Sequence, residues 1–228
     1  MEMDQIEFLA PILVPALFQG LIVTIKLIAL TAPFGLLLGI GIAIGRQYGG
    51  RWLSAACKGY VVFFKGCQLL LLLFMLYFGL PSVGITLPAF TASVLGFILC
   101  NAAYNSEYIR GAIKSIKDGQ MTAAQALGMT RLQTIESIIL PQALRRAIPG
   151  LSNEFIYLIK YSSLAYMITV VELSGEAKVV AAKYFMFSEC FLAAGMVYLA
   201  LATLATYAIP LLERRLAIPG MIMKGSGY

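Results

Sequence analysis

The sequence contains no histidine among its 228 residues, so the commonest metal ligand and general base is absent. Its four cysteines lie far apart in or near apolar segments, without metal or redox spacing. We interpret Cys57, Cys67, Cys100 and Cys190 as small apolar fillers. The phosphate-binding pattern Gly-x-x-x-x-Gly-Lys-Ser/Thr is also missing. We therefore expect this chain to carry no catalytic residue, no metal site, no ATP site and no bound cofactor.

Charge is scarce too. Only 12% of the residues are charged and 60% are hydrophobic, whereas soluble domains carry about 25% charged residues. The chain is therefore predicted to be one membrane domain, residues 1–228. The net charge of +6 does not indicate nucleic acid, because the basic residues are not clustered with aromatic ones. A signal peptide is not expected, since the first ten residues contain Glu2, Asp4 and Glu7 but no Lys or Arg.

The sequence contains several long apolar segments. A bilayer core needs about 20 apolar residues as helix, and five segments qualify: 14–44, 59–80, 88–109, 149–171 and 190–210. The intervening segments 46–58, 110–146 and 211–228 hold twelve of the 17 basic residues. Positive charge is enriched in cytoplasmic loops. We therefore predict five transmembrane helices in an all-α protein, with the N-terminus outside and the C-terminus in the cytoplasm.

The longest polar interruption contains a predicted helical hairpin. Asp118 is expected to cap a first helix, and Gly128 fits the left-handed position just past its end. Thr130 and Gln133 have the spacing of a capping box at the start of a second helix. Pro141 is predicted to end that helix. A surface gripped by a cytoplasmic partner and an ordinary amphipathic connection both fit this pattern.

Polar residues recur at helical spacing within two of the predicted spans. One face of the third span, at i, i+3, i+4 and i+7, carries Asn101, Tyr104, Asn105 and Tyr108. The fourth span carries Glu154 and a polar group made of Asn153, Tyr157, Lys160, Ser162 and Ser163. Such residues in a membrane either bond helices together or line a polar cavity. We predict a polar cavity near mid-membrane, with interhelical bonding as the open alternative.

Two further spacings predict close helix contacts. Gly35 with Gly39, and Gly41 with Gly45, form small-xxx-small pairs that let helices approach closely. Glu107 stands three residues before Arg110, which is an ion-pair spacing on a helix.

The residue order also resembles a known signature. Ala123-Ala124, Gly128 and Ile138-x-Leu140-Pro141 resemble the Glu-Ala-Ala signature of ABC-transporter permeases, with its spacings intact. Thr122 stands where that signature has Glu, and Lys65-Gly66-Cys67-Gln68 stands where the family usually has Arg-Gly-Thr-Pro. Four further stretches resemble the polar amino-acid branch of these permeases, which takes up histidine, glutamine and arginine. They are LFQGLIVTIKL, IRGAIKSIKDGQ, PQALRRAIPGLSNEF and LIKYSSL. The resemblance extends over residues 18–214.

This resemblance implies the type-I importer permease fold, with a permease core over 18–214 and a cytoplasmic coupling loop over 110–148. A separate ABC ATPase dimer, which would bind ATP and Mg²⁺, is expected to grip residues 119–141. The implied coupling residues are Thr122, Ala123, Ala124, Leu127, Gly128, Met129 and Arg131. The other implied partners are an extracytoplasmic solute-binding protein, a second permease copy or a homologous permease, and membrane lipid.

A polar amino acid is the implied substrate, carried across the cytoplasmic (inner) membrane. The candidate substrate pathway consists of Asn101, Tyr104, Asn105, Glu154, Lys160, Ser162 and Ser163. Lys160 belongs to a pattern general to the family, which favours an architectural role. The alternative function is a secondary carrier or channel for small polar solutes, with Glu154 and Lys160 as relay groups. An adjacent ATPase gene and a binding-protein gene would favour the importer.

Overall fold

The computed structural model describes residues 2–216, and the side chains of residues 11–209 and 211. Lys224 and Tyr228, at the end expected in the cytoplasm, lie outside the described residues. The chain begins with one long helix, α1 (Glu2–Tyr48), which contains Pro11, Pro15 and Pro33. It is longer than the predicted span 14–44. Proline is tolerated inside membrane helices because neighbouring groups satisfy the freed carbonyls.

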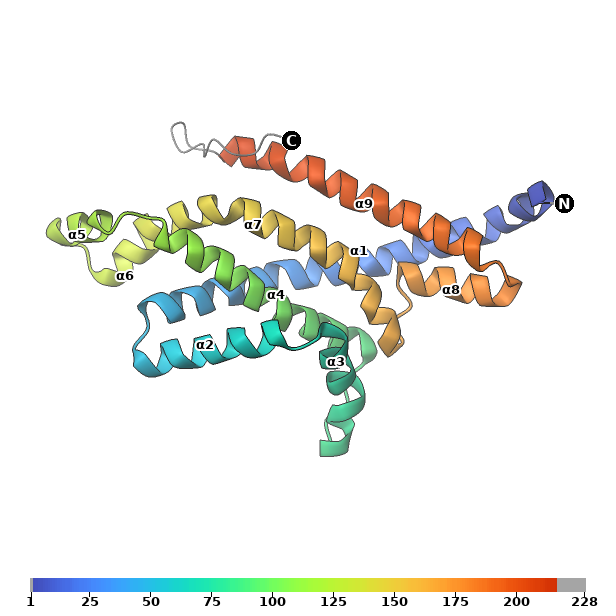
Figure 1. The fold of residues 1–228 in the computed structure, drawn as a ribbon, viewed down its shortest axis with the longest axis horizontal. Helices are drawn as coiled ribbons and strands as arrows, with labels where there is room; N and C mark the ends of the chain where they lie inside the picture. The colour runs from blue at the N-terminus through green and yellow to red at the C-terminus, as the bar shows by residue number, and fades with distance from the viewer. Residues whose placement is uncertain (1, 217–228) are drawn as a thin grey trace.

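The second predicted span, 59–80, is broken. Helix α2 (Arg51–Gly66) ends at two extended residues, Cys67 and Gln68, and the chain then turns by 102°. It continues as α3 (Leu69–Phe74), the π-helical η1 (Met75–Gly79) and the 3-10 helix η2 (Leu80–Val83). The expected continuous helix is therefore wrong, because an extended pair interrupts its backbone hydrogen bonding. Figure 1 shows the segment around α3 projecting away from the long axis of the molecule.

Helix α4 (Ala89–Lys114) lies against α1, and glycine makes this contact possible. A Cβ on Gly39 would lie 2.9 Å from the Asn105 Cβ and 3.1 Å from the Ala102 carbonyl oxygen. A Cβ on Gly35 would collide with the Asn101 side chain. The Gly35/Gly39 prediction is thus confirmed. In the second pair, Gly45 faces Cys57 of α2 but Gly41 faces open space, so Gly41 makes no close helix contact here.

The described chain continues with α5 (Gly119–Ala126), α6 (Arg131–Thr134), the π-helical η3 (Ile135–Ile139) and α7 (Leu140–Tyr161). Then come the 3-10 helix η4 (Ser162–Ile168), α8 (Leu173–Tyr184) and α9 (Phe187–Leu216). The prediction that Pro141 ends a helix is wrong, because helix continues from α6 through η3 into α7. A wider π turn directly before Pro141 leaves its missing N–H without consequence.

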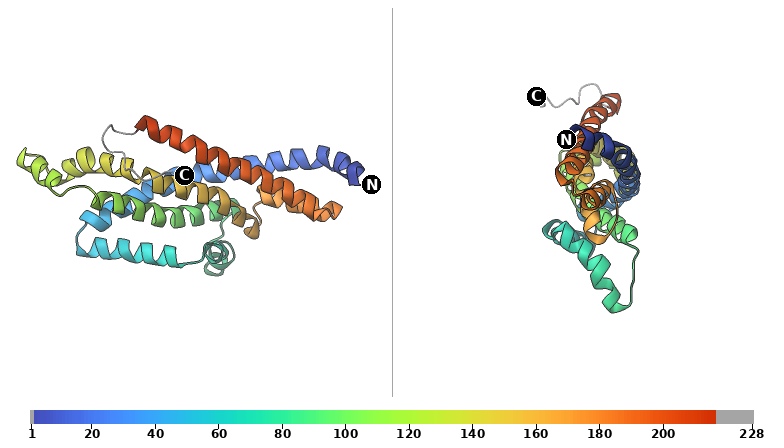
Figure 2. Two further views of the ribbon diagram at one scale, coloured as in Figure 1. Left: turned by 45° about the horizontal axis from the view of Figure 1, so that its top comes forward. Right: turned by 90° about the vertical axis from the view of Figure 1, so that its right-hand side faces the viewer.

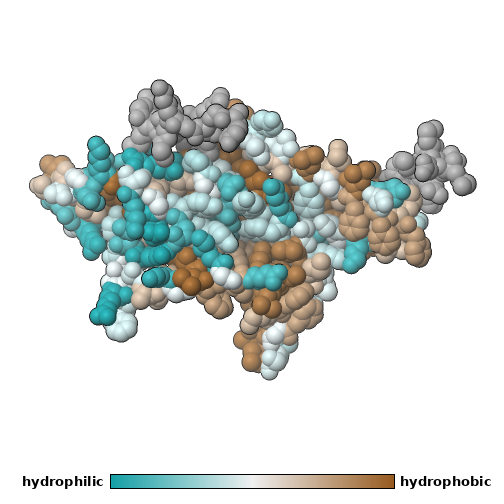
Figure 3. Space-filling model, viewed as in Figure 1, coloured by the Kyte–Doolittle hydropathy of each residue, from teal (hydrophilic) through white to brown (hydrophobic). Residues whose placement is uncertain are grey.

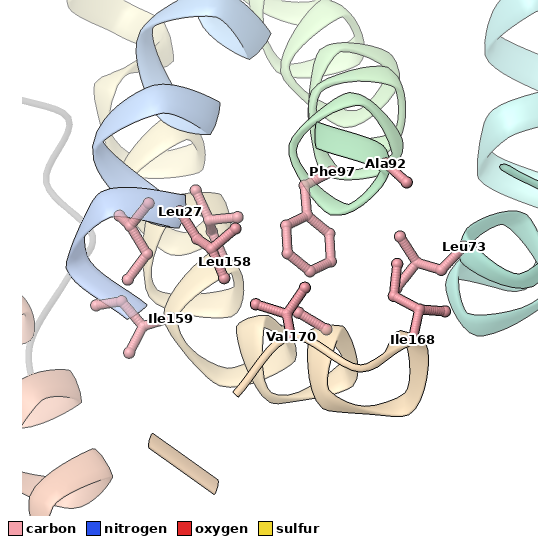
Figure 4. Close-up of a cluster of buried hydrophobic side chains, with 10 residues drawn as sticks. Leu27, Leu73, Ala92, Phe97, Leu158, Ile159, Ile168 and Val170 are labelled. Carbon is pink, nitrogen blue, oxygen red and sulfur yellow. The ribbon is translucent and has the colours of Figure 1, made fainter. Parts of the chain in front are cut away.

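The fourth predicted span, 149–171, also differs from the structure. Helical structure is already present before residue 149 and ends at Thr169, which has a left-handed backbone (φ 71°). The chain then bends by 51° into α8. Phe97 of α4 lies at the centre of the apolar cluster beneath this bend (Figure 4), between Leu27 and Leu158 on one side and Leu73 and Ile168 on the other.

Glu172 joins the helices beyond the bend. It is fully buried and caps α8, accepting hydrogen bonds from the backbone N–H groups of Ser174 (3.0 Å) and Gly175 (3.1 Å). It also accepts from the Tyr198 hydroxyl of α9 and from the Thr24 hydroxyl of α1 (3.4 Å). One carboxylate therefore ties α1, α8 and α9 together, and the two partner helices cover it.

Two of the described helices are long and apolar enough to cross a membrane, Pro11–Tyr48 and Phe187–Ile209. The number rises to four if two bent pairs each count as one span: Arg51–Gly66 with Leu69–Val83, and Arg131–Ile168 with Leu173–Tyr184. Figure 2 shows α1, α4, α7 and α9 running along the long axis. The all-α membrane fold agrees with the prediction, and a count of five spans stays a prediction.

Candidate functional site

The hairpin formed by α5 and α6 lies at one tip of the molecule (Figure 1). Gly128 has φ +88°, the left-handed conformation that the sequence predicted. The backbone N–H of Met129 donates to the Ala124 carbonyl (3.1 Å), which closes the end of α5. The Thr130–Gln133 capping box is also confirmed, with bonds of 2.9 and 3.3 Å. Asp118 stands at the cap position of α5, but its side chain makes no cap bond, which corrects that expectation.

Contacts to α1 and α7 hold this hairpin in place. The Gln142 amide donates to Gln120 Oε1 (2.7 Å), and the Arg131 guanidinium lies over the Tyr48 ring, 5.6 Å from its centre. Met121 packs on the apolar cluster between α1, α4 and α7. The hairpin is therefore a fixed projection and not a loose loop.

The hairpin tip presents apolar side chains outward. Leu127 is 85% exposed and Leu132 is 61% exposed. Most of the seven predicted coupling residues are accessible: Thr122, Ala123, Leu127, Gly128 and Arg131 are exposed, Met129 is half-buried, and Ala124 is buried. Figure 3 shows hydrophilic surface toward this end and apolar surface over the α3 segment and toward the α8 end. An apolar tip amid polar surface is suited to a protein partner rather than to lipid.

An ion-pair cluster lies near the same end. Glu107 of α4 pairs with Arg46 of α1 through one carboxylate oxygen, and with Arg110 through the other (2.6 Å). The predicted Glu107–Arg110 pair is thus confirmed. The second arginine bound to Glu107 is Arg46 of α1, and the spacing within α4 could not predict it. The cluster fixes the end of α1 against α4.

Deeper in the bundle lies a buried polar layer. The Asn105 amide donates to Asn101 Oδ1 (2.7 Å), and the Asn101 amide donates to Glu154 Oε1 (3.4 Å). The Tyr161 hydroxyl also donates to Glu154 Oε1 (3.1 Å). Both ends of the Asn101 amide are therefore bound within the protein, and its side chain is 2% exposed. An adjoining cavity of about 190 Å³ is lined by Asn101, Asn105, Ala32, Pro33, Leu36, Leu151, Phe155 and Leu158.

Other polar residues of α4 and α7 face outward from the described chain. Tyr104 is 36% exposed, and the Lys65 ammonium of α2 lies 5.2 Å from the centre of its ring. On α7, Asn153, Tyr157 and Lys160 are exposed, and the Lys160 ammonium lies 5.5 Å from the Tyr157 ring centre. We call this surface the open seam, defined by Lys65, Tyr104, Asn153, Tyr157 and Lys160.

The structure thus separates the predicted pathway residues into groups. Asn101, Asn105 and Glu154 come together in the buried layer, whereas Tyr104 and Lys160 lie on the open seam. The hydroxyls of Ser162 and Ser163 donate to backbone carbonyls in the last turn of α7, and neither residue lines the cavity of about 190 Å³. Glu154 and Lys160 form no ion pair in the described structure. Within the described side chains, no cluster of His, Cys, Asp or Glu could hold a metal ion.

Comparison with known proteins agrees with this geometry. The family described as "Binding-protein-dependent transport system inner membrane component" matches residues 35–218. The probable amino-acid ABC transporter permease protein YckA of Bacillus subtilis (strain 168) is 37% identical over 203 residues, which is 89% of this chain and 90% of that protein. The octopine transport system permease protein OccM of Rhizobium radiobacter is 33% identical over 207 residues, covering 87% and 84%.

Solved structures show the same fold. An amino acid ABC transporter crystallised with histidines superposes with a TM-score of 0.82 at 30% identity, over 93% of this chain and 97% of that one. The methionine ABC transporter MetNI, in an inward-facing conformation, gives a TM-score of 0.76 over 89% and 97%. At 18% identity this second likeness shows the fold alone. Because the family match and the relatives cover most of the chain, this protein belongs to the inner-membrane components of binding-protein-dependent transport systems, the permeases of ABC transporters.

Proposed function

We propose that this chain is the permease subunit of an ATP-driven importer of polar amino acids. The observation that carries the proposal is the fixed hairpin, whose exposed Leu127–Gly128 tip offers a partner a preformed apolar surface. An ABC ATPase dimer would bind residues 119–141 there, and ATP and Mg²⁺ would be bound by that dimer. The amino-acid transport named for the relatives supplies the substrate class.

The proposed organisation is one membrane domain over residues 1–228, with a permease core over 18–214 and a cytoplasmic coupling loop over 110–148. Packing of α1 against α4 and α8, and of α7 against α4 and α9, supports this division. The alternative of a secondary carrier with a Glu154–Lys160 relay is not favoured. Glu154 is bonded to Asn101 and Tyr161, whereas Lys160 faces outward over Tyr157.

The open seam supports a second permease subunit. A charged side chain near mid-membrane costs about 2.5–3.5 kcal/mol, so Lys160 is not expected to face lipid. A second copy of this chain, or a homologous permease, would cover the seam and enclose a water-filled path. An extracytoplasmic solute-binding protein would deliver the amino acid to the outer end of that path. The buried layer behind the seam would hold α4 and α7 in register.

The function is tested by purifying the permease with its ATPase and its solute-binding protein. We expect one or a few of the twenty common amino acids to increase the rate of ATP hydrolysis severalfold, and only when the binding protein is present. Solute-loaded binding protein drives such a transporter toward the state that hydrolyses ATP. The importer is disproved if a properly assembled complex hydrolyses ATP at one rate with every amino acid.

Orientation is tested by cysteine labelling. Ser82 in η2 is exposed, and the charge distribution predicts that it lies outside. A Ser82→Cys variant should react with a membrane-impermeant thiol reagent in intact cells. A cysteine at Lys117, next to the hairpin, is the matched control and should react only after the membrane is opened. The reverse pattern would invert the orientation and place the hairpin outside, where no ATPase could bind it.

A further inference from the structure

A second cavity, of about 180 Å³, lies between α4 and α7 near the hairpin end of the bundle. It is separate from the buried layer and shares none of its lining residues. Its lining includes Tyr108 and Gly111 of α4, Ser115 directly after α4, and Arg146, Ala147 and Gly150 of α7. A Cβ on Gly150 would collide with the Tyr108 ring, so glycine is needed here for the ring to lie against α7.

The charge in this cavity is not neutralised. Arg146 Nη1 donates to the Ser115 carbonyl oxygen (2.6 Å) and to the Ser115 hydroxyl (2.9 Å). A guanidinium has five N–H donors, and the hydrogen bonds of the described chain use only those on Nη1 of Arg146. No described carboxylate pairs with Arg146. The guanidinium is held in place by Ser115 and keeps donors free for an anion.

The cavity lies on the same side of both helices as the open seam. On α7, steps of three or four residues lead from Lys160 through Tyr157, Asn153 and Gly150 to Arg146. From Tyr104 on α4, the same steps lead through Tyr108 and Gly111 to Ser115, the residue directly after the helix. Residues at this spacing share one helix face. Arg146 and Lys160 are 14 positions apart, so the cavity lies about 21 Å along the helix from the seam's lysine.

We propose that this cavity is an exit site, which binds the α-carboxylate of the amino acid on its way to the cytoplasm. The proposal rests on the proposed function. A fixed arginine with free donors suits a carboxylate, because a guanidinium can bind both carboxylate oxygens at once. The small residues Gly111 and Ala147 leave room for the rest of the amino acid.

The test uses the purified permease–ATPase complex with a reporter cysteine at Gly111. This position is exposed, and a Cβ there meets no atom within 4 Å, so the substitution fits without strain. A small thiol reagent modifies the reporter, and modification is measured by mass spectrometry of the intact chain against the parent protein. The probes are L-glutamine, L-histidine, L-arginine and L-cystine. We expect at least one to slow modification, and its methyl ester, which lacks the carboxylate, to be ineffective.

Arg146 variants are then compared in the reporter background. Arg146→Gln should raise the amino-acid concentration that halves the rate of reporter modification by about 10- to 100-fold. This is the range for a lost hydrogen bond to a charged group. Arg146→Lys keeps the positive charge but loses the planar guanidinium, so its half-protecting concentration should lie between those of the parent reporter protein and Arg146→Gln. Lys117→Gln removes an exposed charge from the same end of the molecule and should leave protection unchanged.

The outcomes separate the two proposals. If an amino acid stimulates ATP hydrolysis with the binding protein but none protects the reporter, the exit site is wrong and the importer stands. Protection that Arg146→Gln does not weaken also overturns the site. If Arg146→Gln instead reduces the amount of assembled complex and leaves protection intact, Arg146 contacts a partner subunit. Failure of every amino acid to stimulate hydrolysis refutes the importer itself.

Discussion

A Gly128→Asp permease should reach the membrane in normal amount and show no transport-coupled ATP hydrolysis. A Cβ added at Gly128 meets no atom within 4 Å, so the substitution causes no clash within the chain. The left-handed backbone (φ +88°) strains a non-glycine residue by about 1–2 kcal/mol, and aspartate tolerates it better than most. Folding should therefore survive, whereas the new carboxylate would be desolvated against the ATPase.

The measurements are the amount of permease in membranes, the amount of ATPase that co-purifies, and amino-acid-stimulated ATP hydrolysis. Gly128→Ala is the matched control, because it adds comparable backbone strain without charge, and it should retain part of the coupling. An unpaired buried charge costs several kcal/mol, so Gly128→Asp should lose the ATPase from the complex. Normal coupled hydrolysis in this variant would show that the hairpin is not the ATPase-binding surface.

Local sequence patterns predicted local structure well. The left-handed Gly128 and the Thr130–Gln133 capping box both depend on residues a few positions apart, and both are present. The Gly35/Gly39 pair also predicted a close helix contact, because two small residues one turn apart leave a groove for a neighbouring helix. In each case the physical cause lies within one or two helical turns.

Features set by distant contacts could not be predicted in this way. Glu172 is 148 positions from Thr24 and 26 from Tyr198, and its burial depends on both partner helices. Sequence alone gave no reason to select it. The break at Cys67–Gln68 lies inside the predicted span 59–80, which contains no proline, and its mean hydropathy indicated an unbroken helix despite the polar Lys65 and Gln68. Pro141 led to the opposite error: a helix end was predicted there, but the preceding π turn accommodates the proline and the helix continues.

On α4, helical spacing correctly predicted which polar residues are neighbours but not which of them are buried. Asn101, Tyr104 and Asn105 were expected to share one face, and they do lie on neighbouring positions around α4. Spacing could not show that α1 and α7 would cover Asn101 and Asn105 while leaving Tyr104 exposed. One turn of helix therefore contains the buried Asn101 amide and the exposed Tyr104 phenol. We expect substitution of Asn101 to lower the yield of complex and substitution of Tyr104 to lower amino-acid uptake per complex.

Asn101→Leu should mainly reduce the amount of assembled complex. The leucine would leave Asn105 Nδ2 without its acceptor, and Glu154 Oε1 would keep the Tyr161 hydroxyl as its donor but lose the Asn101 amide. Asn101, Asn105 and Glu154 are each at most 4% exposed. Leaving the buried Asn105 amide unpaired costs roughly 1–3 kcal/mol, and the lost Asn101–Glu154 bond adds to this cost, against the roughly 5–15 kcal/mol typical of a folded protein. The side chain also lies against Gly35, which leaves little room for relaxation.

Tyr104→Phe is the matched variant, because it removes one exposed hydroxyl from the same helix without disturbing the layer. It should assemble in normal amount and reduce amino-acid uptake per complex, since the hydroxyl faces the proposed path. The two quantities to measure are the yield of complex after gel filtration and the uptake per complex in proteoliposomes. Suppose Asn101→Leu assembled normally but took up little amino acid. Asn101 would then contact the solute directly, and the buried layer would itself be part of the pathway.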